Sequence, residues 1–178
     1  MEKMEVLRQY FGFSSFREGQ QTLIDAVLAG RDVLGVMPTG GGKSLCYELP
    51  ALLLPGLTLV ISPLISLMKD QVMALRNAGI PAGCINSAMS MDELREAYTD
   101  ARYGAYKLLY VAPERLLTDG FCALAQELEI PLVAVDEAHC ISQWGQDFRP
   151  SYLNIPAFVN SLPKQPPVGA FTATATPD

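Results

Sequence analysis

The sequence predicts an α/β domain in which helices cover both faces of a parallel sheet. Of the 178 residues, 49% are hydrophobic, enough for one sizeable core, and the length suits one domain spanning residues 1–178. Short β-rich runs are almost continuously apolar, as expected for strands buried on both faces. Amphipathic helical runs alternate with them, which is typical of parallel sheets.

Six runs are expected to form strands: 32–37, 57–62, 82–86, 108–112, 132–136 and 168–173. Helices are expected over 17–29, 65–78 and 90–102, the last beginning with a capping box in which Ser90 precedes Glu93 by three residues. The apolar stretch 45–67 is interrupted by prolines and by Glu48, so it predicts helix, turn and strand and not a membrane span. In such folds ligands bind at the carboxyl ends of the strands.

Composition excludes several classes of protein. The net charge of -6 argues against a protein that coats nucleic acid indiscriminately, although a narrow basic groove stays compatible with 13 Lys and Arg. The amino-terminal stretch lacks the layout of a signal peptide. Four scattered cysteines and a single histidine favour neither a disulfide framework nor a zinc site, so we expect reduced thiols in a cytoplasmic protein.

A phosphate-binding loop is predicted at "MPTGGGKS", directly after the first strand. Its backbone amides would surround phosphates at the positive end of the following helix. Lys43 would reach the β- and γ-phosphates, and the Ser44 hydroxyl would bind Mg²⁺. The strict pattern has Gly where this chain has Met37, and the alternative is a glycine-rich turn with an incidental lysine.

An acidic pair ends the strand expected over 132–136. Asp136 would hold Mg²⁺, and Glu137 would orient or deprotonate the attacking water. Alone, such a pair is more often a solvated turn, but the phosphate loop in the same sheet favours catalysis. His139 alone would more often be structural, and we assign it to relaying the nucleotide state and not to metal binding.

The loop after the acidic pair combines aromatic and polar residues. Trp144 and Phe148 would offer flat faces to nucleic-acid bases, and Arg149 would pair with phosphate. The alternative is that both aromatic side chains pack in the core while Arg149 forms a surface ion pair. The polar and turn-forming neighbours Ser142, Gln143, Gly145, Gln146 and Asp147 favour an exposed loop.

With "MPTGGGKS" and "DEAH", the chain resembles a superfamily 2 helicase lobe, and further motifs narrow the resemblance to the RecQ family of DNA helicases. These are "FGFSSFREGQ", "SPLISLMKDQ", "VAPERL", "TAT" and, most specifically, "HCISQWGQDFRPSY". The resemblance implies a RecA-like P-loop domain, the first lobe of an ATP-dependent 3′ to 5′ helicase. It implies ATP and Mg²⁺ as cofactors and single-stranded and partially duplex DNA as partners. It also implies a second lobe and accessory domains in a longer chain, nucleoid association in a bacterium, and no membrane.

The resemblance also implies roles for individual residues. The catalytic residues would be Lys43, Asp136, Glu137 and His139, and the metal ligands Ser44 and Asp136. The nucleotide would contact Phe13, Arg17, Gln20, Pro38, Thr39, Gly40, Gly41, Gly42, Lys43 and Ser44, with Arg17 and Gln20 at the base. DNA contact and coupling would fall to Ser62, Pro63, Lys69, Gln143, Trp144, Phe148, Arg149, Thr172 and Thr174.

These motifs also have ordinary structural alternatives. Phe13 and Phe16 would suit a hydrophobic staple, with Gln20 on the surface. The segment 62–71 would suit a strand-to-helix turn with Lys69 solvated, "PERL" a helix start, and the "TAT" threonines a strand. Two other functions stay open: a nucleotide-dependent clamp that does not translocate, and a metabolic P-loop kinase. No arginine occupies a motif that supplies a cationic finger, so the isolated lobe is expected to be nearly inactive.

Overall fold

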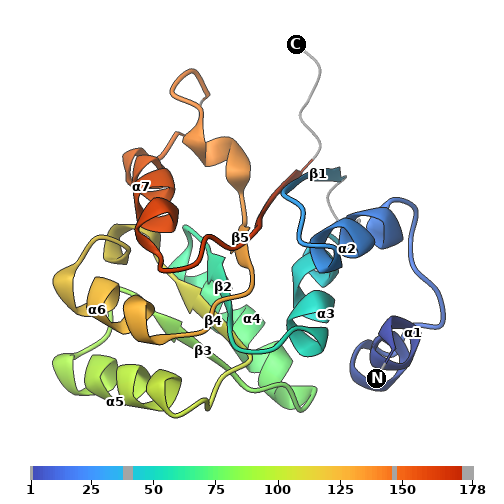
Figure 1. Ribbon diagram of the computed structural model, residues 1–178, viewed down its shortest axis with the longest axis horizontal. Helices are drawn as coiled ribbons and strands as arrows, with labels where there is room; N and C mark the ends of the chain where they lie inside the picture. The colour runs from blue at the N-terminus through green and yellow to red at the C-terminus, as the bar shows by residue number, and fades with distance from the viewer. Residues whose placement is uncertain (1, 38–41, 146–147, 174–178) are drawn as a thin grey trace.

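A six-stranded parallel sheet forms the centre of the molecule. The structure is a computed structural model, and it describes residues 2–37, 42–145 and 148–173. Its strands are β1 Val33–Met37, β2 Thr58–Ile61, β3 Ala82–Ile85, β4 Leu108–Val111, β5 Val133–Val135 and β6 Val168–Ala173. Their order across the sheet is β1-β6-β5-β2-β4-β3, and every neighbouring pair is parallel (Figure 1). The parallel sheet expected from the sequence is confirmed.

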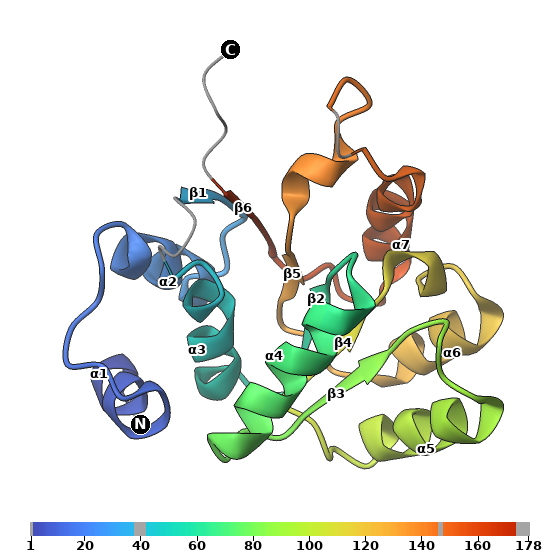
Figure 2. The ribbon, with the colours of Figure 1, turned by 180° about the vertical axis from the view of Figure 1, so that it is seen from behind.

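Helices lie on both faces of this sheet. They are α1 Lys3–Val6, α2 Gln20–Leu28, α3 Leu45–Leu53, α4 Ile65–Asn77, α5 Met91–Arg102, α6 Asp119–Glu127 and α7 Asn154–Ser161. Short helical turns are η1 Leu7–Phe11, which is π-helical, and the 3₁₀ turns η2 Pro113–Arg115, η3 Ala138–Ile141 and η4 Pro150–Leu153. The views from front and back show α2, α3 and α4 on one side and α5, α6 and α7 on the other (Figures 1 and 2).

Two hydrophobic cores result from the alternation of side chains along the strands. Leu59 and Ile61 of β2 belong to the core that α5, α6 and α7 cover. Val60, between them, belongs to the core that α3 and α4 cover. All three side chains are fully buried, so β2 is apolar on both faces, as the continuous hydrophobic run predicted.

Element boundaries differ from the predictions by a few residues. The predicted helix over 17–29 begins only at Gln20, because Gly19 has a φ of 85°, which no residue inside a helix adopts. The predicted capping box of α5 is confirmed: the Ser90 hydroxyl accepts the Glu93 amide at 3.1 Å, and the Glu93 carboxylate accepts the Ser90 amide at 2.9 Å. Within the described residues, the structure contains no helix with the length and apolar character that crossing a membrane requires.

Candidate active site

Lys43 meets the two acids at the carboxyl edge of the sheet. Its Nζ lies 2.6 Å from Glu137 Oε1 and 3.2 Å from Asp136 Oδ1. The acids follow β5, while Lys43 comes shortly after β1 and just before α3, so parallel strands bring together side chains 94 positions apart in the sequence. This is the edge at which ligands bind in parallel α/β sheets.

The charges at this centre depend on one another. Burial raises the pKa of Asp136, and the nearby Lys43 ammonium opposes that rise only in part. Partial burial lowers the pKa of Lys43, but the hydrogen bond to Glu137 and the charge of Asp136 raise it, and the net shift is upward. Lys43 therefore stays cationic and compensates a carboxylate whose side chain is only 1% exposed.

The same residues fit a hard divalent cation. Mg²⁺ takes oxygen ligands and is commonly held by one or two carboxylates together with substrate phosphates. Asp136 offers a buried carboxylate that needs a positive charge beside it, and the Ser44 hydroxyl is the next residue after Lys43. Among the described residues no group of three or more His, Cys, Asp or Glu side chains is arranged to hold a metal ion. A cation here would therefore complete its ligands with oxygens from water or from a bound phosphate.

Glu137 has an unusual backbone conformation. Its φ of 53° and ψ of 46° place it in the left-handed region, as for no other non-glycine residue in the described ranges. Its amide donates to Asp136 Oδ1 at 2.9 Å. Consecutive strand residues normally point to opposite faces, so this turn lets two adjacent carboxylates contact Lys43. Such strain costs roughly 1–3 kcal/mol and concentrates at functional sites.

Tyr152 holds the acidic pair from the other end of the aromatic loop. Its hydroxyl donates to the Asp136 carbonyl oxygen at 2.7 Å, and its side chain is fully buried. The sequence pattern had assigned no role to Tyr152. The available signal was a tyrosine at the end of the aromatic run, because a buried tyrosine hydroxyl usually finds a hydrogen-bond partner.

His139 connects the acidic pair to β6. Its Nδ1 lies 2.7 Å from Thr172 Oγ1, and its Nε2 lies 3.6 Å from Glu137 Oε2. The structure thus brings together the two residues to which the sequence assigned relay and coupling roles. Thr174, the other threonine of that motif, lies outside the described residues.

A cleft of about 600 Å³ adjoins Lys43, between α3 and the segment that precedes α2. Phe13 lines it and is 50% exposed, whereas Gln20 lines it with only 3% of its surface exposed. The Gln20 side chain accepts the Arg17 amide at 2.7 Å and donates to the Gly42 carbonyl at 3.1 Å. The alternative that places Gln20 on the surface is wrong, and Gln20 instead connects the start of α2 to the phosphate loop.

A glycine at position 42 suits both the backbone and this contact. Its φ is 77°, and a Cβ built there would lie 2.3 Å from Gln20 Nε2. The rest of the predicted phosphate-binding loop, Pro38, Thr39, Gly40 and Gly41, lies outside the described residues. Of the predicted loop, the structure therefore describes Gly42, Lys43 and Ser44.

Glu48 is a further acid in the cleft wall, one turn along α3 from Ser44. Burial raises its pKa to about 7; its hydrogen bond to Ser44 lowers it, and the Asp136 carboxylate raises it. The sequence showed Glu48 only as an interruption of an apolar stretch. Glu48 lies four residues after Ser44, so the two side chains are on the same face of α3.

The aromatic loop is exposed at its tip. Trp144 is 95% exposed, Gln143 and Arg149 are exposed, and Phe148 is partly buried. The Arg149 amide donates to the Cys140 carbonyl at 2.9 Å, which closes the base of the loop. The expectation of an exposed loop is confirmed for Gln143, Trp144 and Arg149, and the alternative that packs Trp144 in the core is wrong. Gln146 and Asp147 lie outside the described residues.

Other predicted DNA contacts differ in exposure. Ser62, which follows β2 at the carboxyl edge, is fully buried, while Pro63 is partly buried. Lys69 is exposed on α4, and Thr172 is partly buried near the end of β6.

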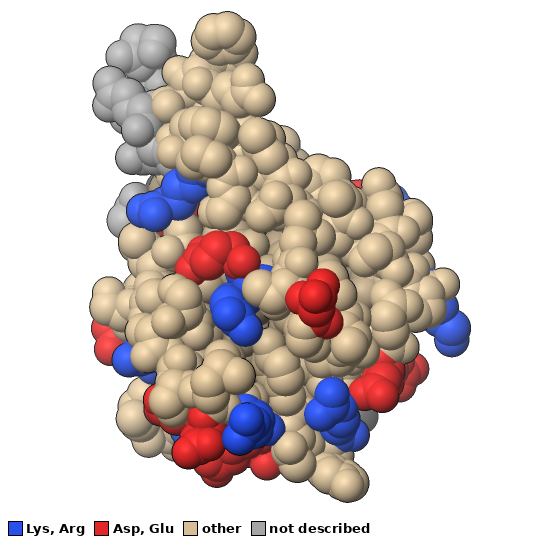
Figure 3. Space-filling view, turned by 90° about the vertical axis from the view of Figure 1, so that its left-hand side faces the viewer, with Lys and Arg blue, Asp and Glu red and all other residues tan. Residues whose placement is uncertain are grey.

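Figure 3 shows Lys and Arg mixed with Asp and Glu on the side carrying α5, α6 and α7, without a continuous basic surface in that view. A DNA contact on this face would therefore have to be local.

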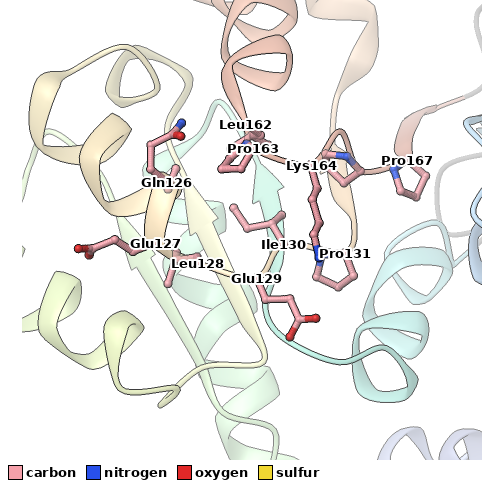
Figure 4. Close-up of a pocket in the computed structure, with 12 residues that line it drawn as sticks. Gln126, Glu127, Leu128, Glu129, Ile130, Pro131, Leu162, Pro163, Lys164 and Pro167 are labelled. Carbon is pink, nitrogen blue, oxygen red and sulfur yellow. The ribbon is translucent and has the colours of Figure 1, made fainter.

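A second hollow, of about 520 Å³, lies at the opposite edge of the sheet (Figure 4). It is lined by the segments that enter β5 and β6, among them Ile130, Pro131 and Pro167. Ligands of parallel α/β sheets bind at the carboxyl ends of strands, and this hollow lies at the amino ends. The cleft beside Lys43, at the carboxyl edge, is therefore the better candidate for a ligand site.

Known proteins resemble this chain throughout its length. The model of the DEAD/DEAH box helicase family matches residues 17–178. "ATP-dependent DNA helicase RecQ" of Bacillus subtilis is 54% identical over 174 residues, which are 97% of this chain and 29% of that protein. The Pasteurella multocida protein of the same name is 51% identical over 97% of this chain and 27% of its own length.

A solved structure agrees with the fold. The Mycobacterium smegmatis helicase Lhr, bound to ssDNA and AMP-PNP, superposes with a TM-score of 0.74 over 97% of this chain and 25% of that chain. At 21% identity this likeness shows the fold alone, and it agrees with the α/β architecture that the sequence predicted. The chain spans less than a third of the length of the two RecQ relatives.

Proposed function

This chain belongs to the DEAD/DEAH box helicase family, and we propose that it is the first, RecA-like lobe of a longer RecQ-type DNA helicase, in which it binds and hydrolyses Mg²⁺-ATP. The observation that carries the proposal is the contact of Lys43 with both Asp136 and Glu137 at the carboxyl edge of the sheet. These three residues supply the cation, the metal-binding carboxylate and the base that phosphoryl transfer to water needs.

Lys43 changes partners when the nucleotide binds. Without phosphate, its ammonium compensates the two carboxylates. With phosphate, it would turn to the β- and γ-oxygens, while Asp136 and Ser44 would hold Mg²⁺, which would supply positive charge to the phosphates. Glu137 is then released from its 2.6 Å contact and is free to orient the attacking water and accept its proton.

The adenine end of the nucleotide occupies the cleft that Phe13, Arg17 and Gln20 line. Phe13 is half exposed and offers a ring face for stacking. Gln20 already touches the phosphate loop through the Gly42 carbonyl, so a base bound at Gln20 is sensed next to Lys43. This arrangement supports a site that reads the base and the phosphates together.

DNA is sensed through the aromatic loop. Tyr152 ties the end of this loop to the Asp136 carbonyl, and His139 ties its start to Thr172. Bases stacked on Trp144 and Phe148, with phosphate at Arg149, would move a segment that is joined to the acidic pair at both ends. Ser62, Pro63 and Lys69 add contacts to the strand, and the intact helicase moves 3′ to 5′.

Strand-length dependence of ATP hydrolysis by the full-length protein tests this function. We expect hydrolysis to be stimulated by single-stranded DNA and to rise with strand length until the motor seldom reaches an end. Glu137→Gln serves as the control that binds nucleotide without turning it over. Stimulation independent of strand length would instead indicate a clamp that does not translocate, and hydrolysis insensitive to DNA would reject both.

A further inference from the structure

Glu48 lies in the wall of the nucleotide cleft without a cation to compensate its charge. It is partly buried on α3 and lines the cleft together with Lys43 and Ser44. Lys43 pairs with the two acids that follow β5. None of the ion pairs formed within the described ranges includes Glu48. Withdrawing an acid from water without a cation beside it costs stability, so the position of Glu48 calls for a reason other than folding.

Two hydrogen bonds join Glu48 to Ser44. The Glu48 amide donates to the Ser44 carbonyl oxygen at 2.9 Å, and the side chains of the two residues are also hydrogen-bonded. An ionised carboxylate only accepts hydrogen bonds, so the Ser44 hydroxyl donates its proton to Glu48. A hydroxyl whose proton is held in this way keeps its oxygen lone pairs for another partner, and a metal ligand needs such a lone pair.

The position of Glu48 in the first turn of α3 has an ordinary alternative explanation. An acid there is stabilised by the positive end of the helix. A fully exposed carboxylate would gain from the helix dipole as well, and it would stay hydrated. The dipole also requires no bond to Ser44. The side-chain bond and the place of Glu48 in the cleft therefore indicate a role in ligand binding.

Gln71 offers a second acceptor in the same cleft. It comes from α4, and its buried Oε1 accepts no hydrogen bond from the residues that the structure describes. A buried amide oxygen is costly unless some group donates to it. Mg²⁺ usually keeps several waters when it binds with a substrate phosphate, and such waters donate hydrogen bonds. The acceptor oxygens of Glu48 and Gln71 therefore suit the surroundings of a hydrated cation.

From these contacts we infer that Glu48 is a positioning residue of the metal site, which fixes the Ser44 hydroxyl so that its oxygen is available to the Mg²⁺ of the bound nucleotide. The inference rests on the proposed function, because it assigns a further residue to the Mg²⁺-ATP site. Residues that orient a metal ligand typically change metal affinity by about 10- to 100-fold when they are replaced. Glu48 thus acts on the metal through Ser44 and not by direct contact.

The Mg²⁺ dependence of nucleotide binding tests this role. The Kd of a non-hydrolysable ATP analogue is measured by calorimetric titration of the full-length protein, in excess EDTA and in excess Mg²⁺, and the ratio of the two values defines the Mg²⁺ coupling. In Glu48→Met, which has an apolar side chain of similar length, the Mg²⁺ coupling should fall by about tenfold or more, while the Kd in EDTA does not rise. Glu48→Gln keeps an oxygen that accepts the Ser44 hydroxyl and should retain most of the coupling. Glu96→Met, at an exposed glutamate of α5, is the matched control for the loss of one negative charge.

A double-mutant cycle shows whether Glu48 acts through Ser44. In a Ser44→Ala background the hydroxyl that Glu48 holds is absent, so Glu48→Met should cause no further loss of Mg²⁺ coupling. Glu48→Ala is measured beside Glu48→Met, so that the result does not depend on how one replacement side chain packs. Circular dichroism verifies that each variant is folded.

Four results would overturn the inference. Unchanged Mg²⁺ coupling in Glu48→Met would show that Glu48 has no part in the metal site, and stronger coupling would show that it withholds Ser44 from the metal. Equal losses in Glu48→Met and Glu48→Gln would mean that the charge matters and the hydrogen bond does not. Additive losses in the double variant would mean that Glu48 does not act through Ser44. Failure of the proposed function is distinguishable from all four, because the unmodified protein itself would then show no Mg²⁺ coupling.

Discussion

At the residue scale, the site is built around Asp136. Its carboxylate contacts Lys43 and the Glu137 amide, and its carbonyl accepts the Tyr152 hydroxyl. The sequence could predict the lysine and the acids because loop and strand patterns mark them. It could not predict the Tyr152 contact, because that contact depends on the path of η4 in three dimensions.

Tyr152→Phe should lower the free energy of unfolding by about 1–2 kcal/mol. The substitution keeps the ring but leaves the Asp136 carbonyl without its buried hydrogen-bond donor. Thermal denaturation of the nucleotide-free chain measures the change, which corresponds to a Tm lower by roughly 2–8 °C. Tyr103→Phe is the matched control, since that side chain is 85% exposed. Equal Tm values for the two variants would show that the Tyr152 bond contributes nothing.

Glu48→Gln should stabilise the nucleotide-free chain above neutral pH. Because burial raises the pKa of Glu48 to about 7, the native state favours the protonated acid. The stability that this proton gives is present below the unfolded pKa and is lost as pH rises through about 7. The difference in the free energy of unfolding between the variant and the unmodified chain should therefore grow by roughly 1–2 kcal/mol from about pH 5 to about pH 8. This range is smaller than the pKa shift alone would give, because solvent at the cleft screens the charge of Glu48. An advantage independent of pH would show that burial does not raise the pKa of Glu48.

At the scale of elements, the aromatic loop shows what a sequence pattern can predict. Its polar and turn-forming residues correctly predicted exposure, and Trp144 is 95% exposed. The contacts at its two ends, His139 with Thr172 and Tyr152 with Asp136, required the fold. The start of α5 was predictable because a capping box at Ser90 marks it. The start of the helix predicted over 17–29 was wrong by three residues, because α2 begins at Gln20, directly after Gly19.

Trp144→Ala in the full-length protein should abolish stimulation of ATP hydrolysis by single-stranded DNA while leaving basal hydrolysis unchanged. A side chain with so little buried surface contributes little to folding, so the stability should change by less than about 0.5 kcal/mol. The lost stacking is worth roughly 1–3 kcal/mol per base. ATPase assays with and without a single-stranded oligonucleotide measure the effect. Full stimulation together with a lower Tm would mean that the loop is a packing element.

At the scale of the whole molecule, the sequence predicted a parallel sheet but not its strand order. Local patterns identify strands, whereas the order β1-β6-β5-β2-β4-β3 depends on which crossovers skip a neighbour. That order brings β1 and β5 to positions where their carboxyl ends deliver Lys43 and the acids to one centre.

We expect Lys43 to hold the phosphates and Glu137 to act only on the attacking water. Calorimetric titration of this chain with Mg²⁺ and a non-hydrolysable ATP analogue, compared with Lys43→Ala and Glu137→Gln, tests it most directly. Losing a charge-assisted contact worth about 1.5–3 kcal/mol should weaken binding by roughly 10- to 100-fold in Lys43→Ala. Glu137→Gln should bind within about threefold of the unmodified chain, because its phosphate and metal contacts remain. Equal loss in the two variants, with both still folded, would contradict the assignment.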